Sequence, residues 1–296
     1  MKKMLFIMNP CSGQKRANRF LPEILSTFNE AGYDVLVHMT AGPGDGDKTV
    51  RRLGAGMDAV VCCGGDGTFN DVVSGLLHSG LDVPVGYIPA GTTNDFANSL
   101  KLPTDVMEAT RAIVDGTPVA YDAGKFGDRY FSYVASFGAF TRASYATPQN
   151  IKNALGHTAY VLEGIQELSQ LRKEHVRMDI GGRIVEDDFL FGAISNSTSV
   201  GGILTLDPSQ VDMRDGLLEV LLVRAPRNLG ELTECIQALK SQKYNCEMIT
   251  FCSAPRVTVY SDPDMPWTLD GEREEGHSEV VVENQHLAVK LLQKLG

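Results

Sequence analysis

Short apolar runs alternate, over the first 120 or so residues, with stretches in which apolar residues recur every three or four positions. A continuous apolar run is typical of a strand buried on both faces, and the recurrence is typical of an amphipathic helix. Pro10 and Gly32 mark two of the ends. The pattern predicts strands at residues 5–8, 34–39, 59–63 and 83–89, and helices at residues 16–31, 47–53, 69–77 and 95–100.

Strands that alternate with helices in this way form a parallel sheet with helices on both faces. In such a sheet, ligands bind beyond the carboxyl ends of the strands. Three of the predicted strands end in turns rich in glycine or polar residues, at residues 9–13, 64–68 and 91–95. We therefore expect a binding site where these turns converge at one edge of the sheet.

The pattern changes after about residue 121, where strand-like segments follow one another without alternating helices. This predicts an antiparallel, sandwich-like domain. A chain of 296 residues suits two domains. We expect an α/β domain over residues 1–122, completed by 286–296 if these form an extra strand, and a β-rich domain over 123–285. In the second domain the pattern predicts strands at residues 128–140, 176–180, 183–194, 217–223 and 256–260, and helices at residues 150–171 and 229–240.

The charge balance of 27 Lys and Arg against 37 Asp and Glu gives a net charge of −10. This argues against nucleic acid as a partner, because a nucleic-acid binder needs a basic face to replace phosphate counterions. No apolar stretch approaches the ~20 residues that span a bilayer, and Met1-Lys2-Lys3 leads into a strand-sized run rather than a signal peptide. The sequence thus predicts a soluble cytoplasmic protein.

The cysteines and histidines give no sign of a zinc or disulfide framework. The six cysteines form no CxxC pair, and we expect reduced, mostly buried thiols. No HExxH or GxSxG motif is present, so the sequence offers no support for a zinc hydrolase or for the commonest kind of serine hydrolase.

The turn after the third predicted strand carries the strongest chemical signal. Gly64, Gly65 and Gly67 permit unusual backbone angles and a close approach of a ligand to backbone amides. Thr68 can cap the following helix, whose N-terminus favours an anion such as phosphate. Asp66 would repel that anion unless Mg²⁺ or a ribose hydroxyl lies between them. The alternative is a tight strand-to-helix turn without a ligand.

A second glycine-containing segment, residues 42–49, resembles a P-loop only superficially. Asp47 stands where the second glycine belongs, and the segment lacks the strand-to-helix context. We interpret it as a solvated loop.

Four motifs together resemble those of the diacylglycerol-kinase catalytic family. They are NPCSG at the first turn, GGDGTFNDVVSGL at the third strand, GTTNDFA at the fourth, and Leu269-Asp270-Gly271-Glu272 near the end of the chain. GGDGT alone is shared with NAD kinases, and the added Asn70 and DGE favour the lipid-kinase branch. The family comprises bacterial lipid kinases related to sphingosine kinases, and more distantly to NAD kinases and phosphofructokinases. The resemblance implies the same α/β fold followed by a β-sandwich-like domain.

The resemblance also implies roles for individual residues. Asp66 and Asp95 would organise Mg²⁺ and phosphates, and Asp270 or Glu272 would take the proton of the lipid hydroxyl as general base, with Asp66, Asp270 and Glu272 as the catalytic set. Asp212, Asp215 and the main-chain oxygen of Leu217 would hold a structural Mg²⁺, although an ordinary Asp-Gly turn is nearly as good an explanation. The nucleotide would meet Asn9, Pro10, Cys11, Ser12, Gly13, Thr40, Gly65, Asp66, Gly67, Thr68, Phe69, Asn70, Asp71, Thr92 and Asp95.

The implied activity is an ATP- and Mg²⁺-dependent transfer of phosphate to diacylglycerol or a related lipid. The enzyme would visit the membrane surface reversibly, and a homodimer is compatible with the family. The chain departs from the family at two cationic positions, where it has Asn98 and Glu163. Lys152, Arg142 or Arg172 are candidates to replace the lost charges.

Two other functions remain open from the sequence. One is an NAD kinase-like phosphotransferase that acts on a soluble acceptor, and the other is a nucleotide-binding regulatory protein without catalysis. The aromatic residues of the second domain are candidates for a lipid slot or for the core, namely Phe126, Phe131, Phe137, Phe140 and Tyr160.

Overall fold

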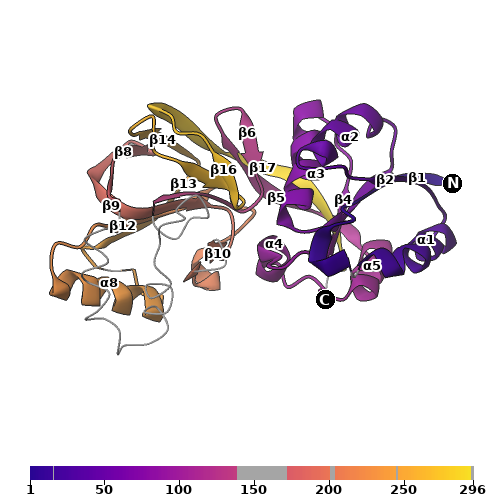
Figure 1. The fold of residues 1–296 in the computed structure, drawn as a ribbon, viewed down its shortest axis with the longest axis horizontal. Coiled ribbons are helices and arrows are strands. Elements are labelled where there is room, and N and C mark those ends of the chain that lie inside the picture. Colours follow the sequence, from indigo (N-terminus) through magenta and orange to yellow (C-terminus); the bar gives the residue numbers. More distant parts are fainter. Residues whose placement is uncertain (16, 139–171, 201–203, 245, 295–296) are drawn as a thin grey trace.

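A computed structural model of the chain describes residues 1–15, 17–138, 172–200, 204–244 and 246–294. The N-terminal domain is built on a parallel sheet in the strand order β4-β3-β1-β2, and the C-terminal domain lies beside it (Figure 1). The four predicted strands are confirmed as β1 (Lys2–Met8), β2 (Tyr33–Met39), β3 (Ala59–Gly64) and β4 (Val85–Pro89).

Helices cover both faces of this sheet. Alternate side chains of each strand point to opposite faces, so each strand contributes side chains to two layers of the core. In β1, Leu5 packs in one core cluster with Val72 of α3 (Asp66–Ser79), while Phe6 packs in another with Phe28 of α1 (Leu21–Glu30). α2 (Asp45–Leu53) joins the first cluster and α5 (Val106–Val114) joins the second. The predicted layered α/β architecture is confirmed.

Helix boundaries differ from the prediction where local chemistry intervenes. The helix expected from residue 16 begins as two 3₁₀ turns, Ser12–Lys15 and Ala17–Phe20, and α1 starts only at Leu21. Pro22 lies in its first turn, the place in a helix where a missing N–H costs nothing. α5 was not predicted from the sequence, although Asp105 caps it by accepting from the main-chain N–H groups of Met107 and Glu108.

The C-terminal domain is antiparallel and centres on β9 (Arg183–Ser195), which pairs with β8, β7 and β12. Its strands are β7 (Val134–Gly138), β8 (Glu174–Ile180), β12 (Leu218–Arg224), β13 (Ile249–Ala254), β14 (Arg256–Tyr260), β15 (Trp267–Leu269) and β16 (Glu272–Glu274). This domain also contains the small sheet of β10 (Ser199–Val200) and β11 (Leu204–Thr205), a 3₁₀ turn at Pro208–Gln210, and α8 (Leu229–Ser241). In the N-terminal domain, the short helix α4 (Asp95–Ser99) follows β4.

The single strand predicted at residues 128–140 is wrong, because the chain forms β6 (Arg129–Phe131) and β7 with a break between them. At the break, the main-chain N–H groups of Ser132, Tyr133 and Val134 donate to the carboxylate of Asp270. The helix predicted at 150–171 lies outside the described residues. β13, β15 and β16 were not predicted from the sequence either.

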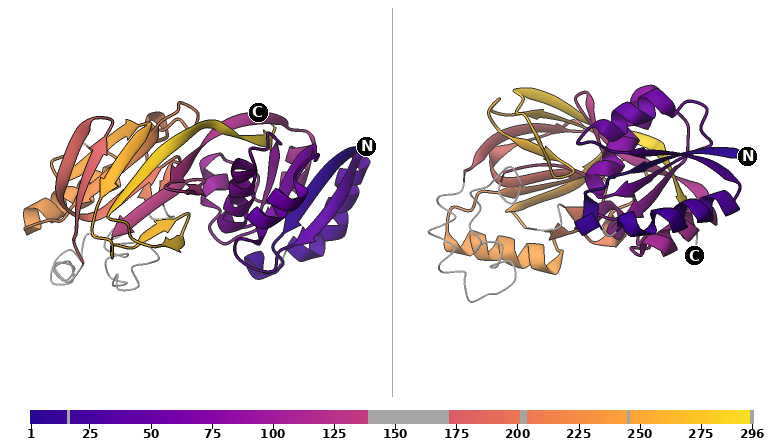
Figure 2. Two further views of the ribbon diagram at one scale, coloured as in Figure 1. Left: turned by 90° about the horizontal axis from the view of Figure 1, so that it is seen from above. Right: turned by 45° about the vertical axis from the view of Figure 1, so that its right-hand side comes forward.

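Two long strands connect the domains. β5 (Thr117–Phe126) and β17 (Glu279–Gln293) pair antiparallel, and β17 pairs with β14 at one end and with β4, in parallel, at the other (Figure 2). The strands of both domains, apart from β10 and β11, therefore belong to one 15-stranded sheet. The expected domain boundary at residue 122 falls inside β5, and residues 286–293 lie in the second part of β17.

Three of the aromatic residues considered for a lipid slot belong to the core. Phe126, Phe131 and Phe137 are at most 2% exposed, and Phe126 and Phe137 pack against Trp267. Phe140 and Tyr160 lie outside the described residues. The six cysteines are free thiols. None of the helices in the described ranges is long and apolar enough to cross a membrane.

Candidate active site

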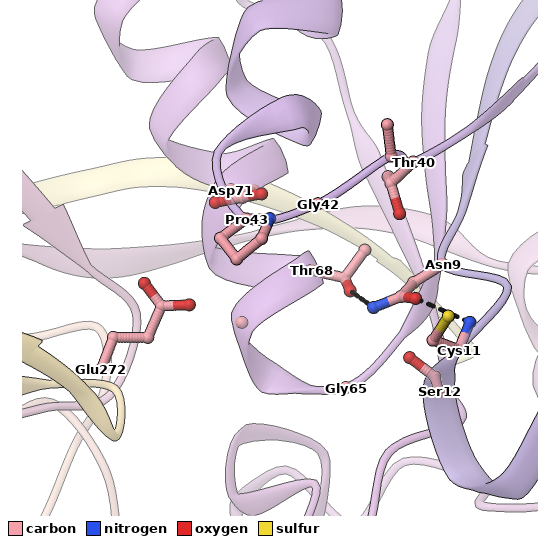
Figure 3. A pocket seen from close by; sticks show the side chains of 12 residues that line it. Asn9, Cys11, Ser12, Thr40, Gly42, Pro43, Gly65, Thr68, Asp71 and Glu272 are labelled. Carbon is pink, nitrogen blue, oxygen red and sulfur yellow. Dashed lines mark hydrogen bonds between the residues drawn. The ribbon is translucent and has the colours of Figure 1, made fainter.

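A cavity of about 310 Å³ lies at the carboxyl ends of β1, β2 and β3 and is bounded on the far side by Glu272 of β16 (Figure 3). Two of the three predicted turns, residues 9–13 and 64–68, thus face a carboxylate from the C-terminal domain, whereas residues 91–95 do not line the cavity. The lining consists of Asn9, Cys11, Ser12, Thr40, Ala41, Gly42, Pro43, Gly65, Gly67, Thr68, Asp71 and Glu272.

The turn after β1 is held rigidly against its neighbours. The side-chain oxygen of Asn9 accepts from the N–H of Cys11 at 2.9 Å, and its amide donates to the hydroxyl of Thr68 at 3.3 Å. Gly13 has φ +52°, and a Cβ atom there would lie 2.1 Å from the carbonyl oxygen of Ala90. Only glycine satisfies both conditions, so this glycine lets the first turn lie directly on the end of β4.

The glycine-rich turn leads into α3, which starts at Asp66, three residues earlier than predicted. Thr68 therefore does not cap the helix, and its hydroxyl contacts Asn9 instead. The N-cap is Gly65, which has no side chain to cover the first-turn amides. Such uncovered amides, with the dipole of a 14-residue helix behind them, favour an anion.

Asp66 points away from the cavity toward α4. Its carboxylate accepts from the N–H groups of Asp95 at 3.1 Å and of Phe96 at 3.3 Å, the first amides of that helix. Asp95 in turn accepts from the hydroxyl of Ser199 at 2.7 Å. Burial raises the pKa of Asp66 above its usual range. The charge that looked unbalanced in the sequence is thus compensated by a second helix N-terminus.

Asp270 occupies the turn between β15 and β16, where its φ is +49°. Its Oδ1 accepts from the N–H groups of Tyr133 and Val134, each at 3.0 Å, and its Oδ2 accepts from that of Ser132 at 2.5 Å. These bonds favour the ionised form, but burial outweighs them and raises the pKa of Asp270 to about 7. The carboxylate is therefore fixed in place and titrates near neutral pH.

The cavity is acidic at the end formed by Asp71 and Glu272. Asp71 accepts from the N–H of Gly44 at 2.9 Å, which ties α3 to the loop after β2. Burial, followed by the negative charge of Glu272, raises the pKa of Asp71 to about 6. The described lining contains no lysine or arginine.

Two family models cover most of the chain. Residues 3–126 match the diacylglycerol kinase catalytic domain, and residues 134–293 match the YegS C-terminal NAD kinase beta sandwich-like domain. The chain is 32% identical to a diacylglycerol kinase of Bacillus subtilis (strain 168) over 275 residues, which are 92% of this chain and 90% of that protein. A diacylglycerol kinase of Staphylococcus carnosus (strain TM300) is 32% identical over 273 residues, 92% of this chain and 89% of the relative.

The chain belongs to the diacylglycerol kinase family. The fold agrees, since the crystal structure of a diacylglycerol kinase from Bacillus anthracis strain Sterne superposes with a TM-score of 0.76 at 20% identity and covers 99% of this chain and 97% of that one. Membership in this family makes the protein a kinase that uses a nucleotide as its phosphate donor.

Nine of the predicted residues lie in the cavity lining. Phe69 is buried between Tyr87 and Phe96, with ring centroids 4.7 and 4.4 Å apart, and belongs to the core. Asn70 contacts the C-terminal domain, accepting from the hydroxyl of Ser132 at 3.0 Å. Predicted residues outside the lining are Pro10, Gly13, Asp66, Phe69, Asn70, Thr92, Asp95 and Asp270.

The interpretation of residues 42–49 as a solvated loop is wrong, because α2 begins at Asp45 and Gly42 and Pro43 line the cavity together with Ala41. The position of this segment directly after β2, at the carboxyl edge of the sheet, could have indicated that it contributes to a binding site.

In the described part of the chain, no new cation lines the cavity. Asn98 donates to the carbonyl of Thr93 at 2.8 Å and completes the α4 turn. Arg172 pairs with Glu174 of β8 at 2.9 Å. Glu163, Arg142 and Lys152 lie outside the described residues.

The turn expected to hold a structural Mg²⁺ has donors that suit this ion. Asp212 and Asp215 each use one carboxylate oxygen within the turn, accepting from the N–H groups of Arg214 and Leu217, and the carbonyl of Leu217 accepts from Asn284. In the described part of the chain, no three His, Cys, Asp or Glu side chains form a metal cluster.

The buried Oε2 of Glu219 has no hydrogen-bond partner, and after burial the charge of Asp215 is among the causes that raise the pKa of Glu219 to about 8. A hard cation beside these oxygens would satisfy the unpartnered atom. The unpartnered Oε2 of Glu219 is thus the observation that favours a cation beside this turn.

Proposed function

We propose that the protein transfers the γ-phosphate of ATP to a hydroxyl group of diacylglycerol or a related lipid. The observation that carries the proposal is Asp270, a carboxylate held by three backbone amides with a pKa of about 7, in the domain that faces the glycine-rich turn. A general base works best when its pKa lies near the working pH.

The donor nucleotide would bind at the carboxyl edge of the parallel sheet. Asn9, Ser12 and Thr40 supply polar side chains to the cavity, and the uncovered first-turn amides of α3 suit its phosphates. In phosphoryl transfer the protein mainly aligns donor and acceptor and compensates charge. Rigid turns such as that around Gly13 meet the first requirement.

The reaction would proceed by attack of the acceptor oxygen on the γ-phosphorus. The bond between that phosphorus and the bridging oxygen breaks, ADP leaves, and the proton of the hydroxyl passes to Asp270. Glu272, two residues further on and lining the cavity, is the second candidate for this proton.

Mg²⁺ is the proposed cofactor, and when bound it would offset the charge of the phosphates. Asp66 and Asp95, which lie beside the cavity rather than in its lining, are the proposed residues for organising it. Asp212, Asp215 and Leu217 are proposed to hold a structural ion. A lipid acceptor implies reversible contact with a membrane surface, and the names of the relatives support diacylglycerol as the first acceptor to test.

The test is phosphorylation of diacylglycerol, a sphingoid base and NAD side by side, with ATP, Mg²⁺ and mixed micelles, followed by mass spectrometry of the products. We expect phosphorylated lipid, and a loss of about 10²–10⁴-fold in kcat for Asp270→Asn. Asp264→Asn, an exposed aspartate of the same domain, is the matched control.

Phosphorylated NAD alone, or ADP binding without turnover of any acceptor, would contradict the proposal. Because Asn at 270 turns an N–H toward Ser132, the thermal midpoint of each variant is measured as well. Full activity in Asp270→Asn combined with loss in Glu272→Gln would assign the base to Glu272.

A further inference from the structure

The described lining of the candidate active site supplies no positive charge, which any triphosphate site requires. Asp71 and Glu272 are the charged residues of the described lining, and both are acidic. Among the ion pairs in the described part of the chain, one joins a lining carboxylate to a cation. Nη2 of Arg129 lies 3.8 Å from Oε2 of Glu272, and its Nη1 donates to Glu274.

The backbone of Arg129 is fixed relative to both domains. Arg129 opens β6, and the next residue, Tyr130, accepts through its carbonyl from Asn70 of α3 at 3.4 Å. The ring of Tyr130 meets that of His78 edge-on with centroids 5.0 Å apart. Ser132, directly after β6, donates its main-chain N–H to Asp270. The backbone at Arg129 therefore keeps a constant position relative to α3 and to the Asp270 turn, whereas its half-exposed side chain can move.

The Glu272 carboxylate occupies a position that suits a phosphate. A Cβ atom at Gly67, in the first turn of α3, would lie 3.2 Å from Oε1 of Glu272. The carboxylate is thus at the N-terminus of the helix, where anions are favoured. A donor phosphate at the same amides would be repelled by Glu272 unless its charge is compensated from the other side.

We propose that Arg129 is a positioning residue, which pairs with Glu272 and reduces repulsion between that carboxylate and the phosphates of the donor. The inference rests on the proposed function, because it concerns the same cavity. Arg129 would thus supply a positive charge near the phosphates. The chain has Asn98 and Glu163 at two positions where its family has cations. The side chains of Arg129 and Glu272 are 45% and 44% exposed, so the pair adjusts without unfolding.

The experiment measures binding of ATP (as its non-hydrolysable imido analogue), ADP and AMP to Arg129→Met, in the presence of Mg²⁺, by calorimetry. We expect the dissociation constant to rise about threefold to fivefold for the triphosphate, the range of a partly exposed ion pair, and less for AMP. Arg129→Lys should recover part of the loss. Arg273→Met is the matched control, since Arg273 is exposed on the same strand as Glu272 and forms no ion pair among the described residues.

The double variant Arg129→Met/Glu272→Gln tests whether Arg129 affects nucleotide binding through Glu272 or by contacting the nucleotide directly. If Arg129 acts through Glu272, its removal changes nothing further once Glu272 is neutral. Additive losses, or an unchanged dissociation constant in Arg129→Met, overturn the inference while leaving the lipid kinase assignment intact. Failure of the unmodified protein to bind any nucleotide would instead reject the proposed function itself.

Discussion

Ser132 and Asp270 are 138 residues apart in the chain and are joined by a 2.5 Å hydrogen bond from the main-chain N–H of Ser132 to Oδ2 of Asp270. The hydroxyl of Ser132 also donates to Asn70 on α3 at 3.0 Å. One residue at the break between β6 and β7 therefore connects the proposed base to the helix that follows the glycine-rich turn. The distance between these two parts of the site is set by this connection.

Replacing Ser132 with alanine should destabilise the protein by about 1–3 kcal/mol, because it leaves the buried side-chain oxygen of Asn70 without its donor. The main-chain bond to Asp270 remains. Urea unfolding measures the free energy, and Ser209→Ala, an exposed serine, is the control. Equal stability of the two variants would show that the Ser132–Asn70 bond contributes nothing.

The pH dependence of the reaction should follow the titration of Asp270. Its pKa is raised by burial to about 7, so the carboxylate is protonated below this pH and able to accept a proton above it. We expect kcat/KM to rise with pH through about 7, with a decline of about tenfold per unit on the acid side. A profile that is already flat at pH 5 would exclude Asp270 as the base.

The sequence predicts the parallel sheet well because β1, β3 and β4 are buried on both faces and read as nearly continuous apolar runs. It predicts the turn around Gly65 because glycine density is a local signal. The cradle of Asp270 has no such signal, since its donors are main-chain N–H groups of Ser132, Tyr133 and Val134, which any residue supplies. The hydrogen bonds from the first amides of α4 to the Asp66 carboxylate could not be predicted for the same reason.

Gly13 should tolerate no side chain. Gly13→Ala combines a φ of +52° with a Cβ atom 2.1 Å from the carbonyl of Ala90, so we expect a loss of about 2–4 kcal/mol in stability and weaker ADP binding. Gly32→Ala is the matched control, since Gly32 has φ +86° but no atom within 4 Å of a Cβ. It should lose only the backbone contribution of about 1–2 kcal/mol. Equal losses in the two variants would mean that the first turn moves away from β4.

Removal of Mg²⁺ should lower the stability of the C-terminal domain if the Asp212–Leu217 turn holds the ion. A ligand that binds only the folded state stabilises it by RT ln(1 + [L]/Kd), so added Mg²⁺ should raise the thermal midpoint, and EDTA should reverse the rise. Asp215→Asn should abolish most of this shift, because it removes a charged donor beside the unpartnered oxygen of Glu219. Asp207→Asn is the matched control, since Asp207 forms a similar turn by accepting from Ser209. A shift of the same size in both variants would place the stabilising ion elsewhere and leave this turn a structural one.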